Sequence, residues 1–333
     1  MTLRRRVILT VLVFGVIAAA ACLLAPLVGS TPVSLRRVFD RGLPFHDNAD
    51  AQIFFIARLP RTLAAALVGA ALAAAGVVFQ ALLRNPLATP FTLGVSAGAA
   101  LGAMLAITFP VALAFAGVTT VPIASFAGAI GAVAVVYFLA TARRQGLSTS
   151  VLLLAGITLN SFFSSLILFV QYLADFTQTF RTVRWLLGDL DVAGYGPIVA
   201  ALPFMVIAFG AFAWLPRSLN LLTLGADAAS ARGVDVLRTQ RLAFFSASLA
   251  TGAAVSLGGP VGFIGIIVPH LVRLLVGSDH RIVLPASALF GAAFLVSCDV
   301  AARTLLAPME LPVGVLTAMI GGPFFLWLLI RKA

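Results

Sequence analysis

The sequence predicts an all-α integral membrane protein with ten transmembrane helices, a fold class supported by its composition, apolar runs and short loops. Apolar residues make up 61% of the 333 residues and charged residues only 10%, whereas soluble domains average about 45–50% and about 25%. Apolar runs of about 20 residues, enough for a helix to cross a bilayer, recur along the chain. The polar stretches between them are too short to form a soluble domain, so residues 1–333 are expected to form a single transmembrane domain.

Ten apolar segments are candidate spans. Several contain Gly or Pro, which membrane helices tolerate where neighbouring helices satisfy the freed backbone groups. Small residues such as Gly69, Gly76 and Gly98 suit close helix packing, because lipid supplies no hydrophobic drive between helices. The first apolar run is too long for a signal peptide and is expected to remain as a helix. The predicted spans are residues 7–28, 61–83, 93–109, 121–141, 149–173, 196–215, 240–258, 261–277, 282–306 and 312–330.

The distribution of arginines predicts the orientation. With Arg4, Arg5 and Arg6 in the cytoplasm, the inside loops, which include Arg143 and Arg144, hold 14 cations and 3 acids, a net charge of +11, and the outside loops hold 8 cations and 8 acids. This bias follows the positive-inside rule. The sequence therefore predicts a multi-pass protein in the lipid of a bacterial cytoplasmic (inner) membrane, with both termini in the cytoplasm. Because the arginines are dispersed between apolar segments, they do not indicate a nucleic-acid partner.

The residue types present exclude the common catalytic chemistries. The only lysine is Lys332, so the chain lacks the lysine that a phosphate-binding loop requires. Cys22 and Cys298 lie in apolar segments without the spacing of metal ligands. The sequence contains no catalytic triad or paired carboxylates, so we expect a transport channel subunit with no enzyme activity and no cofactor of its own. An alternative class is a secondary carrier driven by an ion gradient, for which Asp299 is the best titratable candidate.

Residues 216–241, here called the coupling segment, form the longest polar break in the C-terminal half, and the orientation places them in the cytoplasm. Asp227 fits an N-cap, and Arg232 and Gly233 fit the end of a short helix. A leucine-rich run before this helix ends at Gly225. We interpret the segment as a docking platform for a separate ATPase; the alternative is an ordinary solvated loop.

Three arginines lie at the predicted outer ends of spans. Arg58 and Arg61 lie in ARLPRT at the outer mouth of the second span, and Arg303 lies at the outer end of the ninth. Charges beside a span are costly and usually have a function. One interpretation is a set of cationic sockets for acidic groups of an external partner, because a planar guanidinium suits carboxylates. The alternative is snorkelling or internal pairing, such as Arg303 with Asp299 four residues earlier.

The fifth span carries a polar face. Asn160, Ser164 and Gln171 recur at helical spacing, flanked by Ser161 and Ser165. This face is a candidate lining for a transport pathway. The alternative is structural: serine hydroxyls bonded to carbonyls of their own helix, with Asn160 as a contact between helices.

Four longer motifs point to a family. They are ARLPRTLAAALVGAALAAAGVVFQALLRNPLATPFTLGVSAGA (57–99), LSTSVLLLAGITLN (147–160), GPVGFIGIIVPHLVRLLVGSDHRIVLP (259–285) and ELPVGVLTAMIGGPFFLWLL (310–329). In this order, and over nearly the whole chain from about Arg58 to Lys332, the sequence resembles the FecCD-type permeases. These are the membrane subunits of type II ABC importers for ferric siderophores, haem and cobalamin.

The resemblance implies the architecture of a complex. It implies the type II ABC importer permease fold, with ten helices per subunit, and a homodimer with the pathway on its two-fold axis. It also implies two cytoplasmic ABC ATPase subunits, which would bind ATP and Mg, and a periplasmic or extracellular substrate-binding protein.

The resemblance also assigns roles to single residues. The arginines expected to receive glutamates of the binding protein are Arg58, Arg61 and Arg303. The positions expected to form the cytoplasmic gate are Asn85, Leu87, Thr149 and Ser150. The stretch from Leu219 to Val236 resembles the coupling helices that enter the ATPase cleft, with candidate contact residues Leu219, Leu222, Gly225, Asp227, Ala229, Arg232 and Gly233.

The cargo is the least determined feature. The external segment 29–57, which contains His46, and the stretch 181–195 match no single substrate subclass. We expect import of an iron chelate, either a ferric siderophore or haem, and cobalamin is the alternative cargo within the same family.

Overall fold

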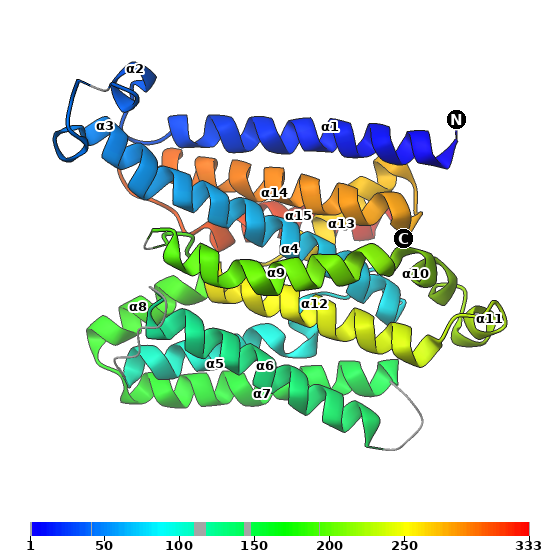
Figure 1. Cartoon of the computed structure of the whole chain (residues 1–333). Helices are drawn as coiled ribbons and strands as arrows, with labels where there is room; N and C mark the ends of the chain where they lie inside the picture. Colours follow the sequence, from blue (N-terminus) through cyan, green and yellow to red (C-terminus); the bar gives the residue numbers. More distant parts are fainter. Residues whose placement is uncertain (1, 41, 110–117, 143–147, 193, 333) are drawn as a thin grey trace.

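A computed structural model describes residues 2–40, 42–109, 118–142, 148–192 and 194–332, and the elements that it contains are helices. Among these residues, seven helical segments are long and apolar enough to cross a membrane. Their main helices are α1 (Leu3–Leu24), α4 (Leu59–Leu83), α6 (Thr120–Thr141), α7 (Thr149–Leu173), α9 (Gly196–Trp214), α12 (Val236–Gly258) and α14 (His280–Thr304). The shorter apolar helices are α5 (Val95–Thr108), α13 (Ile264–Val276) and α15 (Val313–Lys332). The helices run side by side as one bundle (Figure 1).

Each of the ten predicted spans coincides with one of these helices, and the all-helical membrane class is confirmed. The helices often start earlier than predicted, because helical backbone continues past the apolar core into charged residues. The helix of the second span is the clearest case. Two elements extend it outward: α3 (Ala49–Gln52) and a π-helical turn, η3 (Ile53–Arg58). Together with α4 they form one helical stretch of 35 residues, Ala49–Leu83. Pro60 is the second residue of α4 and directly follows the π-helical turn, an irregular turn of the kind at which a helix accommodates a residue that has no N–H to donate.

Helices α4, α12 and α14 form the centre of the bundle. Of their most apolar stretches, 78%, 72% and 67% are buried, against 11% for α1 and 22% for α7. The backbones of α4 and α14 meet at Gly69 and Gly291: a Cβ atom at Gly69 would lie 2.2 Å from the Gly291 carbonyl oxygen. A second close approach joins Gly76 to Gly265 of α13, also at 2.2 Å. Small residues therefore set the distance between the central helices.

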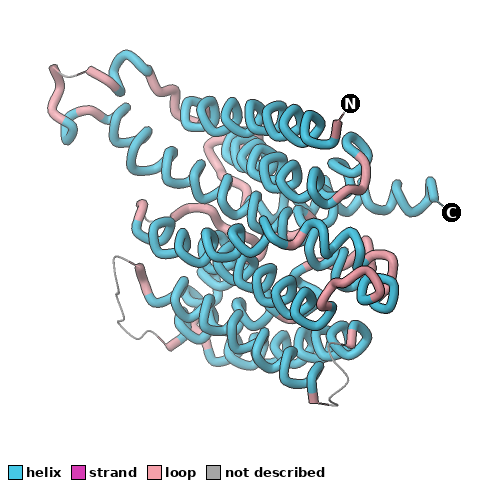
Figure 2. The backbone as a smooth tube through the Cα atoms, turned by 45° about the vertical axis from the view of Figure 1, so that its right-hand side comes forward, coloured by secondary structure: helices cyan, strands magenta, loops and turns pink. Residues whose placement is uncertain are grey.

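The ends of the bundle differ. The short helices α2 (Leu35–Val38) and α3 lie at one end, and α10 (Pro216–Leu222) and α11 (Ala226–Ser230) lie at the other (Figures 1 and 2). The N-terminus of α1 and the C-terminal end of α15 lie at the α10–α11 end. The predicted inside cations Arg143 and Arg144 fall outside the described residues.

The coupling segment folds as the two short helices α10 and α11 against the bundle, and its last six residues form the start of α12. Leu219 and Leu222 of α10 are buried. The prediction of Asp227 as an N-cap is wrong: α11 begins at Ala226, and its N-cap is Gly225, whose φ of +119° favours glycine. Asp227 lies instead in the first turn, where its charge still suits the helix dipole.

The expected end of this helix is close to the observed one. Helix α11 ends at Ser230, and Gly233, with φ of +80°, turns the chain shortly after it. Arg232 donates a hydrogen bond from Nη1 to the Ala228 carbonyl oxygen at 3.2 Å, so it satisfies an acceptor near the C-terminus of α11.

We predict that Gly69→Ala lowers the free energy of unfolding by about 1–3 kcal/mol, because the added methyl group has no room beside Gly291. Gly210→Ala in α9 is a matched control, since nothing lies within 4 Å of its added Cβ atom. Equilibrium unfolding of both purified variants in detergent micelles measures the difference. Equal stability of the two variants would contradict the packing argument.

Candidate functional site

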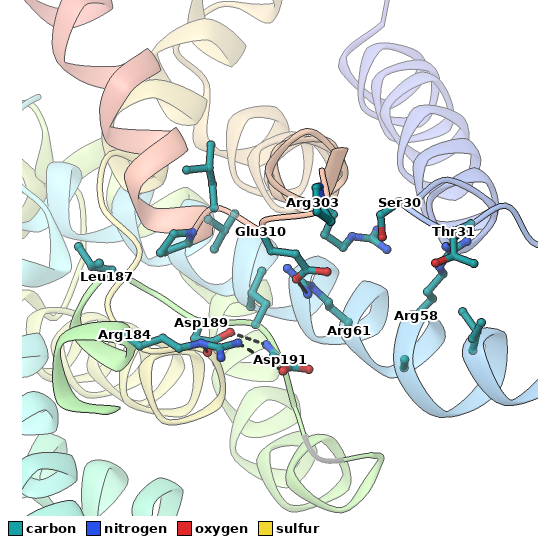
Figure 3. A pocket seen from close by; sticks show the side chains of 18 of the residues that line it. Ser30, Thr31, Arg58, Arg61, Arg184, Leu187, Asp189, Asp191, Arg303 and Glu310 are labelled. Atoms are coloured by element: carbon teal, nitrogen blue, oxygen red, sulfur yellow. Dashed lines mark hydrogen bonds and ion pairs between the residues drawn. The ribbon is translucent and has the colours of Figure 1, made fainter. Parts of the chain in front are cut away.

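A cavity of about 730 Å³ opens at the α2–α3 end of the bundle. Arg58, Arg61 and Arg303, predicted from the sequence as a set, all line it, and we call it the arginine pocket. Figure 3 shows their side chains together with those of Glu310, which follows α14, and of α8 (Phe176–Leu186) and the segment after it. The lining also includes Gly29, Ser30 and Thr31, so the fold brings residues from four separate parts of the chain to one site.

Asp299 ties two of these arginines together. Its Oδ1 accepts a hydrogen bond from Arg61 Nε at 2.8 Å, and its Oδ2 lies 3.0 Å from Arg303 Nε. Asp299 is 1% exposed and Arg303 is 4% exposed. On its other side, Arg61 Nη1 reaches Glu310 Oε2 at 2.5 Å. The structure thus contains the internal pairing of Arg303 with Asp299 that the sequence offered as an alternative to docking, as their i, i+4 spacing permits.

Arg58 has a different environment. Its guanidinium donates hydrogen bonds to the carbonyl oxygens of Pro26, at 3.2 Å, and Thr31. Within the described ranges it forms no ion pair with a carboxylate. Gly29 packs against it so closely that a Cβ atom there would lie 2.4 Å from Nη2. The carbonyls satisfy its donors but do not neutralise its charge, so Arg58 gives the pocket an uncompensated positive charge.

Sequence reasoning missed the acidic half of this site. Arg184 of α8 pairs with Asp189 Oδ2 at 2.6 Å and with Asp191 Oδ2 at 3.4 Å, and all three residues line the pocket. Helix α8 itself was not predicted, although Asp175 and Gln178 form a capping box at its start. That S/T/D-x-x-Q/E pattern was the available signal.

The predicted pathway residues line one groove. Asn160, Ser164 and Gln171 of α7 border a cavity of about 500 Å³ together with Ser96 of α5 and Pro260. Asn160 donates from Nδ2 to the Phe91 carbonyl oxygen of η4 (Pro90–Leu93) at 2.8 Å. The groove thus has three polar side chains of α7 among apolar ones such as Ile167 and Leu168, and Asn160 also joins α7 to η4.

The flanking serines follow the structural alternative. Ser161 and Ser165 donate to carbonyl oxygens four residues earlier, at 3.2 and 3.0 Å, so their hydroxyls are satisfied within α7.

The predicted gate residues lie in two places near the α10–α11 end. Asn85 and Leu87 are in the turn after α4, where Asn85 Oδ1 accepts from the Leu87 N–H at 2.9 Å. Thr149 and Ser150 begin α7, which is capped by Ser148. The described residues show no hydrogen bond between the two pairs, and their role as a gate stays a prediction.

The described part of the chain also holds no group of three or more His, Cys, Asp or Glu side chains arranged to bind a metal ion. The site offers charged side chains at one end of the bundle and a largely apolar groove with three polar α7 side chains, features that suit binding and passage.

We predict that Asp299→Asn lowers the free energy of unfolding by about 3 kcal/mol, because it leaves two buried guanidinium groups without their shared charge. Asp191→Asn, which removes a pair on an exposed carboxylate, should change stability by less than about 1 kcal/mol. Denaturant titrations of the two variants in the same detergent test this difference. A stable Asp299→Asn protein would show that the buried cluster is not needed for the fold.

Comparisons with known proteins agree with this architecture. The model of the FecCD transport family matches residues 16–331. The chain is 42% identical over 275 residues to the uncharacterized ABC transporter permease protein YvrB of Bacillus subtilis, covering 83% of this chain and 78% of that one. It is 37% identical to the hemin transport system permease protein HmuU of Yersinia pestis, covering 92% and 90%.

The fold agrees as well. A solved metal-chelate type ABC transporter in an inward-facing conformation superposes with a TM-score of 0.83 at 31% identity, covering 97% of this chain and 99% of that chain. Since family, relatives and fold coincide over almost the whole sequence, the chain belongs to the FecCD transport family and is an ABC transporter permease subunit, a membrane protein that is not itself an enzyme.

Proposed function

We propose that this chain is the permease subunit of an ATP-driven importer that carries an iron chelate, a ferric siderophore or haem, across the bacterial cytoplasmic membrane. One observation carries the proposal. In a chain matched along its length by the FecCD family, the arginine pocket and the coupling segment lie at opposite ends of one bundle. An importer needs such an arrangement, because its cargo arrives on one side and nucleotide is hydrolysed on the other.

The orientation in this proposal places the arginine pocket outside and the coupling segment in the cytoplasm. Ten crossings then put both termini in the cytoplasm, which is supported by their common position at the α10–α11 end. The coupling segment presents Asp227 and Arg232 to solvent, together with Leu224, whose side chain is 61% exposed. A separate ATPase that binds ATP and Mg would cover this surface, and the exposed leucine suits an apolar anchor in its cleft.

The arginine pocket would receive the substrate-binding protein. Carboxylates on that protein would meet the unpaired charge of Arg58, and they would compete with Glu310 for Arg61. Glu310 is suited to such an exchange because its side chain is 43% exposed, unlike that of Asp299.

A homodimer completes the pathway in this proposal. Helix α7 is only 22% buried and exposes Phe162, Phe169 and Tyr172 beside its groove. A second copy facing α7 would cover this side and enclose the groove lined by Asn160, Ser164 and Gln171.

Cobalamin is the second candidate cargo. The chain is 44% identical over 276 residues to the cobalamin import system permease protein BtuC of Halobacterium salinarum, against 37% over 310 residues and 36% over 324 residues for its hemin- and iron dicitrate-transport relatives. An ion-gradient-driven carrier is not supported, because the chain is an ABC permease and its candidate titratable group, Asp299, is held between two arginines.

We predict that Arg58→Glu raises the dissociation constant of the binding protein about tenfold at low ionic strength, equivalent to about 1.4 kcal/mol. The effect should shrink in high salt, because the attraction between the pocket and an approaching acidic partner acts through solvent and is screened by ions. Arg36→Glu, on α2 and outside the pocket lining, is the control. Surface plasmon resonance with the permease in nanodiscs measures both, and an unchanged constant for Arg58→Glu would count against docking at the pocket.

Reconstituted vesicles test the function as a whole. Vesicles holding the permease, its ATPase and its binding protein should accumulate a radiolabelled ferric siderophore or haem only when ATP is enclosed, and a proton gradient alone should drive no uptake. Cobalamin in the same vesicles distinguishes the cargoes. Uphill uptake by the permease without an ATPase would overturn the proposal.

A further inference from the structure

A single side chain, Asn220, joins the coupling segment to the start of α14. Its Nδ2 donates to Asp279 Oδ1 at 2.7 Å, and its Oδ1 accepts from the backbone N–H of His280 at 2.9 Å. His280 Nδ1 lies 2.6 Å from the same oxygen. Because that oxygen only accepts, the His280 proton in this arrangement is on Nδ1. The nitrogen and the oxygen of this one amide therefore both bind residues of α14's start, which lie 59 and 60 positions later in the sequence.

The partners of Asn220 are themselves fixed. Asp279 is the N-cap of α14 and pairs with Arg281 at 2.6 Å. The Arg281 side chain, followed by the Asn220 amide, holds the pKa of Asp279 well below its usual range, so this carboxylate is charged. A hydrogen bond from an amide to a charged carboxylate is about twice as strong as one between neutral groups. His280 is 6% exposed, which limits competition from water.

The joint lies on the route from the coupling segment to the bundle. Helix α11 packs on α10 and α12, and α10 in turn packs on α14 and α4. The other contacts of α10 include the buried side chains of Leu219 and Leu222. Apolar contacts are non-directional and allow sliding, whereas hydrogen bonds to both sides of a planar amide fix position and orientation.

Helix α14 continues from this joint to the arginine pocket. Asp279 and Asp299 are 20 residues apart, about 30 Å along a helix with a rise of about 1.5 Å per residue. Asp299 binds Arg61 of α4 and Arg303 at the pocket. The close approach at Gly69 and Gly291 keeps α4 and α14 together. A movement of the start of α14 would therefore also move the residues of both helices that line the pocket.

We propose that Asn220 is a positioning residue that makes α14 follow the coupling segment, and so links the ATPase contact to the arginine pocket. The inference rests on the proposed function, since it requires that an ATPase act on residues 216–241. Asn220 itself need not touch the ATPase or the cargo. Its contribution is to transmit movement between two sites that lie at opposite ends of the bundle.

The test uses the complete complex of permease, ATPase and binding protein in vesicles. Asn220→Leu keeps the size of the side chain but removes its hydrogen bonds. We expect the assembled complex to hydrolyse ATP, to lose stimulation by the binding protein, and to import about tenfold less substrate per ATP. Thr141→Val is the control, because among the described residues the hydrogen bonds of the Thr141 hydroxyl stay within α6. Import per ATP within about twofold of the unaltered complex would overturn the proposal.

If the Asn220→Leu complex does not assemble, variants that exchange the side chains of Asn220 and Asp279 test the same role. Asn220→Asp places a second carboxylate against Asp279, and the like charges should repel. Combining it with Asp279→Asn restores one amide and one carboxylate across the joint. We expect Asn220→Asp to lose coupling, measured as substrate imported per ATP. The double variant should import several-fold more per ATP than Asn220→Asp, and Asp279→Asn alone shows the effect of the second change by itself. A double variant as uncoupled as Asn220→Asp would overturn the proposal.

A wrong function and a wrong role for Asn220 would give different results in these vesicles. If the unaltered complex imports no substrate with ATP, the proposed function is wrong. If the unaltered complex and Asn220→Leu both import with the same yield per ATP, the proposed function stands and only the role of Asn220 is refuted.

Discussion

The close approach of α4 and α14 is the constraint on which the remaining features depend. At Gly69 and Gly291 a Cβ atom on either helix would come within 2.4 Å of the facing carbonyl oxygen. Lipid offers no hydrophobic drive between helices, so contact at this distance supplies the packing energy. It also fixes how the ends of the two helices face each other. Arg61 can meet Asp299 at one end, and at the other α10 packs against both helices.

The charges at the arginine pocket show how a membrane protein keeps buried arginines. Arg61 and Arg303 share Asp299, whereas Arg58 uses backbone carbonyls. A buried ion pair contributes little net stability compared with an apolar replacement, because desolvation offsets attraction. Its presence here is better explained by orientation. The cluster aligns two helices and, among the described residues, leaves Arg58 as the pocket cation without a carboxylate partner, a charge that suits an acidic partner, while the opposite end of the bundle presents short helices with mixed charge.

Local patterns determined the helices well and their exact ends less well. The ten apolar segments all became helices, because hydropathy over about 20 residues reports the environment directly. Helix α8 was missed since its 11 residues are too few and too mixed in polarity to suggest a span. The N-cap of α11 was predicted at Asp227 and is observed at Gly225. The backbone there has a positive φ, which glycine tolerates and which side-chain capping preference alone does not predict.

The amino-acid sequence alone determined the class of the protein: a helical membrane protein without a phosphate-binding lysine, with a positively charged side, and with the motifs of a permease. These properties depend on residue types and short-range order. Only the tertiary structure decided which groups meet. Arg61 pairs with Asp299, which lies 238 positions later in the sequence, and Asn220 binds Asp279, 59 positions later. The partner of a charge or an amide is chosen by the packing of helices distant in sequence, and no local pattern records that choice.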